Sequence, residues 1–250
     1  MDLRHLLVLL LASFAAGAIN AVAGGGSFLT FPALVLGGVP PLIANATNTV
    51  GLLPATFSSA WAYRKDLGAA RGELPLRPFI LVSFAGGALG SLLLLFTPEK
   101  VFEAFVPWLL LFATAVFAFG RTLSLWLRAR VHLSLGVLIL TQFFIGIYGG
   151  YFGGGIGILM LAMLGLYGMT DMHAMNGMKT VLSGCMNIVA ALIFVFAHAV
   201  WWREAAWMLV AAIGGGVAGP WLARRLPASV LRGFVIAVGA TMSVYFFMRN

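Results

Sequence analysis

Residues 176–196 read NGMKTVLSGCMNIVAALIFVF, a stretch with the length of a membrane-spanning helix and one charged residue, Lys179. An ammonium group in the hydrocarbon of a bilayer costs at least about 2.5–3.5 kcal/mol on insertion scales. Two interpretations are open. Either Lys179 is a functional positive charge that faces a cavity, or it lies near a helix end and extends to the lipid headgroups.

The whole chain has the composition of a polytopic membrane protein. Its 250 residues are 62% hydrophobic and 9% charged, whereas soluble domains carry about 25% charged residues. The net charge of +8 comes mostly from short loops between apolar segments, which is typical of the positive-inside rule and does not indicate a nucleic-acid partner. One cysteine, Cys185, excludes an intramolecular disulfide, and no Cys/His cluster has metal-binding spacing, so we expect neither metal nor cofactor.

Apolar segments, all expected to be helices, follow one another along the chain. Those of spanning length are 5–23, 42–63, 76–97, 101–120, 131–151, 173–200, 204–223 and 229–248. Two further segments, 27–37 and 155–168, are short for a full span, and whether they cross the membrane or re-enter it stays open. The first segment follows Arg4 as in a signal peptide but lacks a cleavage site, so we expect it to be retained.

The two halves of the chain, 1–125 and 126–250, repeat the same order of features. Gly24-Gly25-Gly26 matches Gly153-Gly154-Gly155 at an offset of 129 positions. The stretch NATNTV at 45–50 matches NGMKTV at 176–181 at an offset of 131. Because five segments per half is an odd number, the second copy would be upside down in the membrane. We therefore predict an all-α membrane domain of two inverted repeats, with broken or short helices after the glycine-rich elements.

Loop charges agree with the inverted arrangement. One side of the membrane would hold Arg64, Lys65, Arg71, Arg77, Arg121, Arg128, Arg130, Arg224, Arg225 and Arg232, and the other Arg4, Lys100, Arg203 and Arg249. The positive-inside rule places the richer side in the cytoplasm and both termini outside. If the short segments were re-entrant, the copies would be parallel and the loop with Arg224 would lie outside.

Polar residues gather in the repeated elements. The glycine triplets open short helices whose N-terminal N–H groups would carry partial positive charge into the interior. No acidic residue lies in mid-span, so a lone lysine among amides and hydroxyls indicates a cavity for a small anion. The candidate substrate-binding residues are Lys179, Asn176, Asn45, Asn48, Gly24, Gly25, Gly26, Ser27, Gly153, Gly154, Gly155, Thr56 and Asn187.

Other roles for these polar groups stay open. They could satisfy one another across the pseudo-two-fold axis, and the triplets could serve only close helix packing, the role expected of Gly86-Gly87 and Gly214-Gly215-Gly216. Thr56, Ser58 and Ser59 in the first copy, and Ser183 and Asn187 in the second, are weaker site candidates. Asn20 and Gln142 fit helix–helix hydrogen bonds equally well.

The motifs resemble those of the sulfite exporter TauE/SafE family. The resemblance rests on AGGGSFLTFPAL at 23–34, ANATN at 44–48, Tyr63-Arg64 and NGMKTV at 176–181, and it covers essentially the whole chain. It implies a multi-pass protein of the bacterial inner membrane that transports small anions, often sulfur oxyanions or organosulfonates such as sulfite or sulfoacetate, and often exports them. The second glycine element, 149–157, is richer in aromatic residues than expected, which bears on the size of the pocket.

We therefore hypothesise a secondary transporter that works by alternating access, with an anion channel as the alternative. An enzyme is disfavoured because the sequence carries no metal triad, Asp pair or Gly-x-Ser-x-Gly motif, and a receptor subunit because loops are few. The expected partners are a small anionic substrate and the lipid bilayer. Coupling to protons or another ion, for which Asp171 and His173 are the nearest titratable pair, and assembly as a homodimer stay open.

Overall fold

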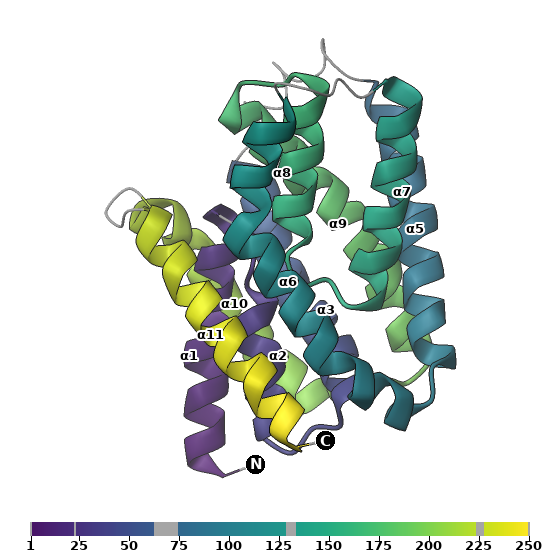
Figure 1. Cartoon of the computed structure of the whole chain (residues 1–250). Helices are drawn as coiled ribbons and strands as arrows, with labels where there is room; N and C mark the ends of the chain where they lie inside the picture. The colour runs from purple at the N-terminus through teal and green to yellow at the C-terminus, as the bar shows by residue number, and fades with distance from the viewer. Residues whose placement is uncertain (1, 23, 63–74, 129–133, 224–227, 250) are drawn as a thin grey trace.

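The computed structural model of the chain describes residues 2–22, 24–62, 75–128, 134–223 and 228–249, and every regular element among them is an α-helix (Figure 1). The helices are α1 (Leu3–Val22), α2 (Ser27–Leu36), α3 (Pro41–Ala62), α5 (Leu76–Phe96), α6 (Glu99–Arg128), α7 (Leu135–Tyr151), α8 (Ile156–Tyr167), α9 (Met172–Phe196), α10 (Trp202–Ala223) and α11 (Ala228–Arg249). The predicted all-α fold is confirmed, and each helix corresponds to one predicted segment.

Three helix ends differ from the prediction by four residues or more. Helix α7 begins at Leu135 and not at residue 131, and Ser134 before it has an extended backbone. Helix α9 ends at Phe196, although the apolar run continues to residue 200, because His198 adopts a left-handed backbone conformation with φ of 54°. The N–H of Ala199 donates to the carbonyl of Phe194, which closes the helix in a Schellman-type turn. Helix α6 extends to Arg128, eight residues beyond the predicted apolar run.

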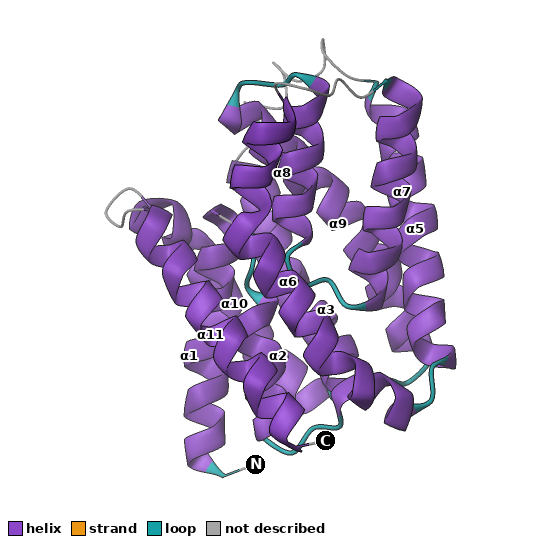
Figure 2. Ribbon diagram, in the orientation of Figure 1, coloured by secondary structure: helices purple, strands orange, loops and turns teal. Residues whose placement is uncertain are grey.

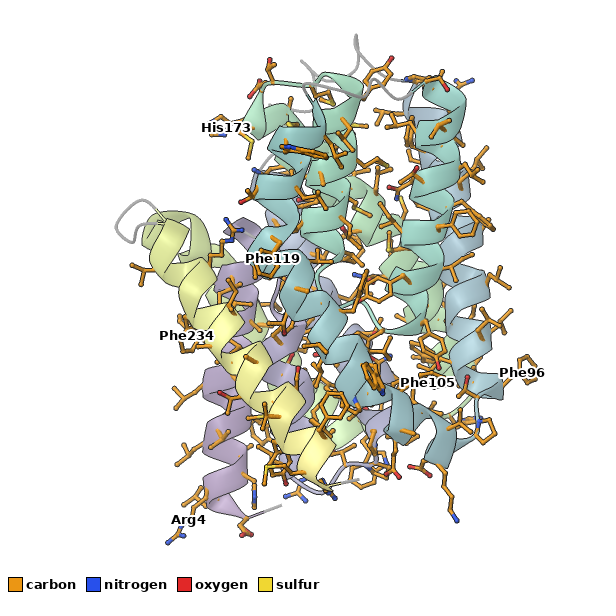
Figure 3. The ribbon with its side chains drawn as sticks, viewed as in Figure 1. Arg4, Phe96, Phe105, Phe119, His173 and Phe234 are labelled. Atoms are coloured by element: carbon orange, nitrogen blue, oxygen red, sulfur yellow. The ribbon has the colours of Figure 1, made fainter. Side chains whose placement is uncertain are left out.

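The outer surface of the bundle is suited to lipid. Helices α1, α5, α6 and α9 are each long and apolar enough to cross a membrane. Large aromatic side chains point outward around the bundle, including Phe96, Phe105, Phe119 and Phe234 (Figure 3). Since soluble monomers rarely expose large contiguous apolar surface, these features fit a multi-pass membrane protein.

The short helices α2 and α8 do not span the membrane alone. Their 10 and 12 residues make them about 15 and 18 Å long, against a hydrocarbon thickness of about 30 Å. Each lies beside the helix that precedes it, and a Cβ atom on Gly26 would lie 2.6 Å from the carbonyl oxygen of Ala16 in α1. The loops before α2 and α8 lie in the middle of the bundle (Figure 2). The chain therefore reverses direction at mid-depth, once in each half, so α2 and α8 are re-entrant. Because α1 and α7 turn back together with them, α3, α5 and α6 are left to cross in the first half and α9, α10 and α11 in the second. Three crossings per half is still an odd number, so the expectation that re-entrant segments would make the copies parallel does not hold.

Two of the described basic residues lie at the same end of the bundle. Helix α1 begins and α11 ends at that end, whereas α7 begins at the other (Figure 1). Arg4 lies at the first end (Figure 3), and Arg249 lies in the last turn of α11. Arg64, Lys65, Arg71, Arg130, Arg224 and Arg225, together with Ala23 and Tyr63 of the family motifs, lie outside the described residues.

Helix packing follows the repeat. Helix α1 packs on α10 and α7 packs on α5, while α3 packs on α10 and α9 packs on α5. If each helix is replaced by its counterpart in the other half (α1 by α7, α3 by α9, α10 by α5), the pair α1/α10 becomes α7/α5. In the same way, the pair α3/α10 becomes α9/α5. Since each group combines helices from both halves, 1–125 and 126–250 are intertwined. Their inverted relation stays a prediction that this pattern supports.

Glycines permit these close packings. Gly17 and Gly146 lie 129 positions apart, in α1 and α7. A Cβ on Gly146 would lie 3.2 Å from the Cα of Gly86, and one on Gly17 would collide with the carbonyl oxygen of Ala212. Small residues at these interfaces let the backbones approach closely, which is the role expected for Gly86-Gly87 and Gly214–Gly216.

Candidate functional site

Local signals fix where α3 and α9 begin, and these two helices pack against each other at the centre of the bundle. Helix α3 begins at Pro41, a residue favoured in the first turn because its missing N–H has no partner there anyway. Helix α9 is capped by Asp171, whose Oδ1 accepts from the N–H of His173 at 2.9 Å. Asp171 therefore has a structural role, and His173 projects outward from the end of the bundle (Figure 3).

The two glycine turns meet beside these helices. Gly24 has a φ of +74° and Gly153 a φ of +81°, a left-handed conformation that favours glycine. The N–H groups of Gly24 and Gly153 close the ends of α1 and α7 in the same way, by donating to carbonyls five residues earlier. A Cβ atom on Gly24 would lie 2.9 Å from the Cα of Gly157, so the breaks of the two halves touch.

A cavity lies between the glycine turns and helices α3 and α9. Its volume is about 60 Å³, which is enough to hold water. It is lined by Asn20, Gly24, Ser27, Asn48, Thr49, Leu52, Thr56, Ser59, Gly149, Phe152, Gly153, Ile156, Gly157, Lys179, Thr180, Ser183 and Asn187. None of these lining residues is acidic.

Most of the lining consists of equivalent positions in the two halves. Three pairs are 129 positions apart, namely Asn20/Gly149, Gly24/Gly153 and Ser27/Ile156. Four pairs are 131 positions apart, namely Asn48/Lys179, Thr49/Thr180, Leu52/Ser183 and Thr56/Asn187. The cavity therefore lies where the two copies of the repeated motif face each other, although the paired side chains differ.

Among the described residues that line the cavity, Lys179 is the only charged one. It is 2% exposed, and its Nζ donates to Oδ1 of Asn176 at 2.9 Å. Among the residues that the structure describes, no carboxylate forms an ion pair with it. An ammonium group that is buried in this way, with one neutral partner, leaves a net positive charge in the cavity wall.

The structure divides the predicted site residues into two groups. Lys179, Asn48, Gly24, Ser27, Gly153, Thr56 and Asn187 line the cavity, whereas Asn45, Asn176, Gly25, Gly26, Gly154 and Gly155 do not. The second group contacts protein instead. Asn45 Nδ2 donates to the carbonyl of Tyr151 at 2.9 Å, and Asn176 Nδ2 to that of Met172 at 2.9 Å.

Several lining residues were weak candidates in the sequence or were missed. Asn20, Ser59 and Ser183 line the cavity, whereas Gln142 Nε2 donates to Ser83 Oγ at 2.8 Å and links α7 to α5. Helical spacing identifies Leu52, because it lies four residues from both Asn48 and Thr56 on one face of α3. Phe152 has no such signal.

Helices that break in the middle of a membrane bundle and meet at a polar cavity are typical of membrane transporters. The family model described as sulfite exporter TauE/SafE matches residues 9–246, and the chain belongs to this family. No solved structure was found to match the chain.

Curated relatives carry transporter names. The chain is 31% identical over 246 residues to the "Probable membrane transporter protein ORF9" of Sinorhizobium sp, which covers 96% of this chain and 92% of the relative. It is 28% identical over 242 residues to a "Probable membrane transporter protein" of Haemophilus influenzae, with 95% and 92% covered. It is also 28% identical over 237 residues to "Probable membrane transporter protein YfcA" of Escherichia coli K12, with 94% and 87% covered. Family and relatives make this chain a membrane transporter.

Proposed function

We propose that the protein is a secondary transporter that exports small anions, sulfur oxyanions or organosulfonates, across the bacterial inner membrane. The observation that carries the proposal is the buried ammonium of Lys179 in a cavity without acidic residues. A buried charge is stabilised by a counter-charge. Since no described protein carboxylate supplies one, a bound anion is the natural partner of Lys179.

The other cavity groups suit an anion. Ser27 and Ile156 are the first residues of α2 and α8, and both line the cavity. The N-terminus of a helix carries partial positive charge and free N–H groups, which favour bound anions. The N-termini of α2 and α8, one from each half of the chain, therefore add to the positive electrostatic potential that Lys179 creates in the cavity.

The substrate class follows from the family and from the size of the cavity. The family is described as sulfite exporters, and the relatives are named only as probable transporters. Phe152 and Ile156 narrow the cavity with apolar side chains. A compact anion with several acceptor oxygens, such as sulfite or a small sulfonate, suits a cavity of about 60 Å³.

Transport would alternate access to this cavity from the two membrane faces. The helix groups α1/α10 and α5/α7 each combine both halves. Helix α10 packs on α3 and α5 packs on α9, so the contacting pair α3/α9 lies between the two groups. We infer that one group rocks against the other around the broken helices, as in other inverted-repeat transporters. The side of the membrane that holds more of the basic loop residues would face the cytoplasm.

Anion flux into proteoliposomes tests the proposal. Lys179→Met removes the charge at nearly constant length, and Lys100→Met removes an exposed lysine as a control. Truncating one partner of a buried charge pair costs about 2–5 kcal/mol, so we expect a rise in KM of at least about 30-fold for Lys179→Met and none for Lys100→Met. Saturating flux that responds to a counter-ion would identify a transporter, and non-saturating flux a channel. Unchanged uptake of every anion by Lys179→Met would overturn the proposal.

A further inference from the structure

Two asparagines that line the cavity have their amide oxygens hydrogen-bonded to the protein. Asn20 Oδ1 accepts from the backbone N–H of Gly26 at 3.0 Å. Asn48 Oδ1 accepts from the hydroxyl of Thr30. A primary amide has one oxygen acceptor and two N–H donors. These contacts therefore fix which end of each amide is held, and they leave the N–H donors as the free end.

Lys179 completes a set of groups that can only donate. Its ammonium has three N–H donors and no acceptor, and one donor is used by Asn176 Oδ1. Among the described residues, neither Asn20 Nδ2 nor Asn48 Nδ2 donates to a protein atom. Three side chains from α1, α3 and α9 thus bring free donors to one cavity.

Three hydroxyl groups in the cavity wall are adaptable. The hydroxyls of Thr49, Ser59 and Thr180 each donate to the carbonyl four residues earlier in their own helix, at 3.0, 2.8 and 2.7 Å. A hydroxyl can rotate and so can donate to a ligand or accept from it. The side chains that printed contacts hold in place, Asn20, Asn48 and Lys179, therefore present donors to the cavity, whereas these hydroxyls are free to change role. Asn187 also lines the cavity, and no hydrogen bond to a described residue fixes which end of its amide faces the ligand.

We propose that Asn20, Asn48 and Lys179 form a fixed three-point donor set that binds the oxygens of a deprotonated anion and discriminates against anions that also carry an ammonium group. This inference rests on the proposed function and adds Asn20 as a specificity-determining residue. Donors held in place before binding need no reorganisation when an oxyanion arrives. An ammonium group on the ligand would instead meet the like charge of Lys179 and no carboxylate, which is an effective means of rejection.

Asn20 has no counterpart in the second half, where Gly149 occupies the equivalent position. The donor set is therefore asymmetric about the repeat, as is the pair Asn48/Lys179. The asymmetry gives the ligand one preferred orientation in the cavity, with its oxygens toward these three side chains.

The experiment compares two ligands of the same size. Isethionate and taurine are two-carbon sulfonates that differ only by a hydroxyl or an ammonium group. We expect purified wild-type protein to bind isethionate at least about tenfold more tightly than taurine in calorimetric titrations, because of the like charges. Sulfite serves as the compact reference anion.

The decisive variant is Asn20→Asp. Its carboxylate can still accept from Gly26 N–H, so the turn is kept, but an acceptor replaces the two donors. We expect sulfite and isethionate affinity to fall at least about 100-fold, and the preference for isethionate over taurine to vanish or reverse. Thr170→Asp adds the same charge in an exposed turn and should leave both ligands unaffected.

Other outcomes separate this inference from the proposed function. If Lys179→Met loses anion binding but Asn20→Asp keeps it, the donor set is wrong and the transporter site stands. If wild-type protein binds none of the anions, or Lys179→Met binds them normally, the proposed function itself fails. Should Asn20→Asp not fold, Asn20→Ser removes the amide without adding charge, and unchanged isethionate affinity in that variant would overturn the inference.

Discussion

The substitution Asn176→Asp tests whether the uncompensated charge of Lys179 is what binds the anion. Asn176 Oδ1 lies 2.9 Å from Lys179 Nζ, and aspartate has nearly the same shape as asparagine. The variant would therefore place a carboxylate in ion-pair contact with the ammonium. The net charge of this part of the cavity wall would change from +1 to zero while the lysine stays in position.

The magnitude follows from the geometry. An anion bound on the cavity side of the ammonium would lie about 5–6 Å from the new carboxylate. Two unit charges at that separation repel by about 3 kcal/mol with an effective dielectric constant of about 20, which weakens binding about 100-fold. The free protein would lose the amide bond to Met172, about 1 kcal/mol, and gain a charge-assisted bond, so its melting temperature should change little.

Calorimetric titration with sulfite and a thermal melt of the same sample measure both quantities. Asn176→Leu is the matched control, because it removes the neutral partner of Lys179 and leaves the charge in place. We expect its anion affinity to be at least that of the wild type. A folded Asn176→Asp protein that binds sulfite as tightly as the wild type would refute the reasoning.

Three further predictions concern the frame of the site. Gly90→Ala should lower the melting temperature by an amount equivalent to about 1–3 kcal/mol, because the added Cβ would collide with the carbonyl of Ile147. Gly136→Ala is the control, since Gly136 has open space around it, and equal melting temperatures for the two variants would contradict the packing described for α5 and α7. Asn45→Leu should cost about 1–3 kcal/mol by leaving a buried carbonyl in the second glycine element unpaired, and a melt as high as that of the wild type would show that this link is dispensable. Asp171→Ala should lower the folding stability by about 1 kcal/mol through loss of the helix cap, and Asp171→Asn should lower it much less. If Asp171→Asn kept its stability but lost the pH dependence of uptake, Asp171 would instead have a role in proton coupling.

The fold was largely predictable because hydrophobic length is a strong signal in membrane proteins. Each apolar segment became a helix, including the short segments after Gly24–Gly26 and Gly153–Gly155. The direction of α2 and α8 was not predictable, since it depends on how the turn residues contact the preceding helix. The contact of Gly26 with Ala16 shows the reversal, and no local pattern encodes it.

The site was predictable only in part, and helix geometry explains the difference. The internal repeat identified Asn48 and Lys179 as equivalent positions, and both line the cavity. Asn45 and Asn176 lie three residues earlier, which is about 60° around the helix. That rotation turns Asn45 toward the backbone of Tyr151 and Asn176 toward Lys179 and Met172. Asn20 needed the folded turn, because only its bond to Gly26 shows how it is oriented.

The central claim is that the charge of Lys179 binds the transported anion. The most direct measurement is the thermal shift of purified protein with sulfite, thiosulfate, sulfoacetate and a carboxylate, for the wild type and for Lys179→Ala. Ligand stabilisation grows with the ratio of ligand concentration to Kd, so the true substrate should give the largest shift in the wild type and none in the variant. Equal shifts in both proteins, for every anion that stabilises the wild type, would contradict the claim.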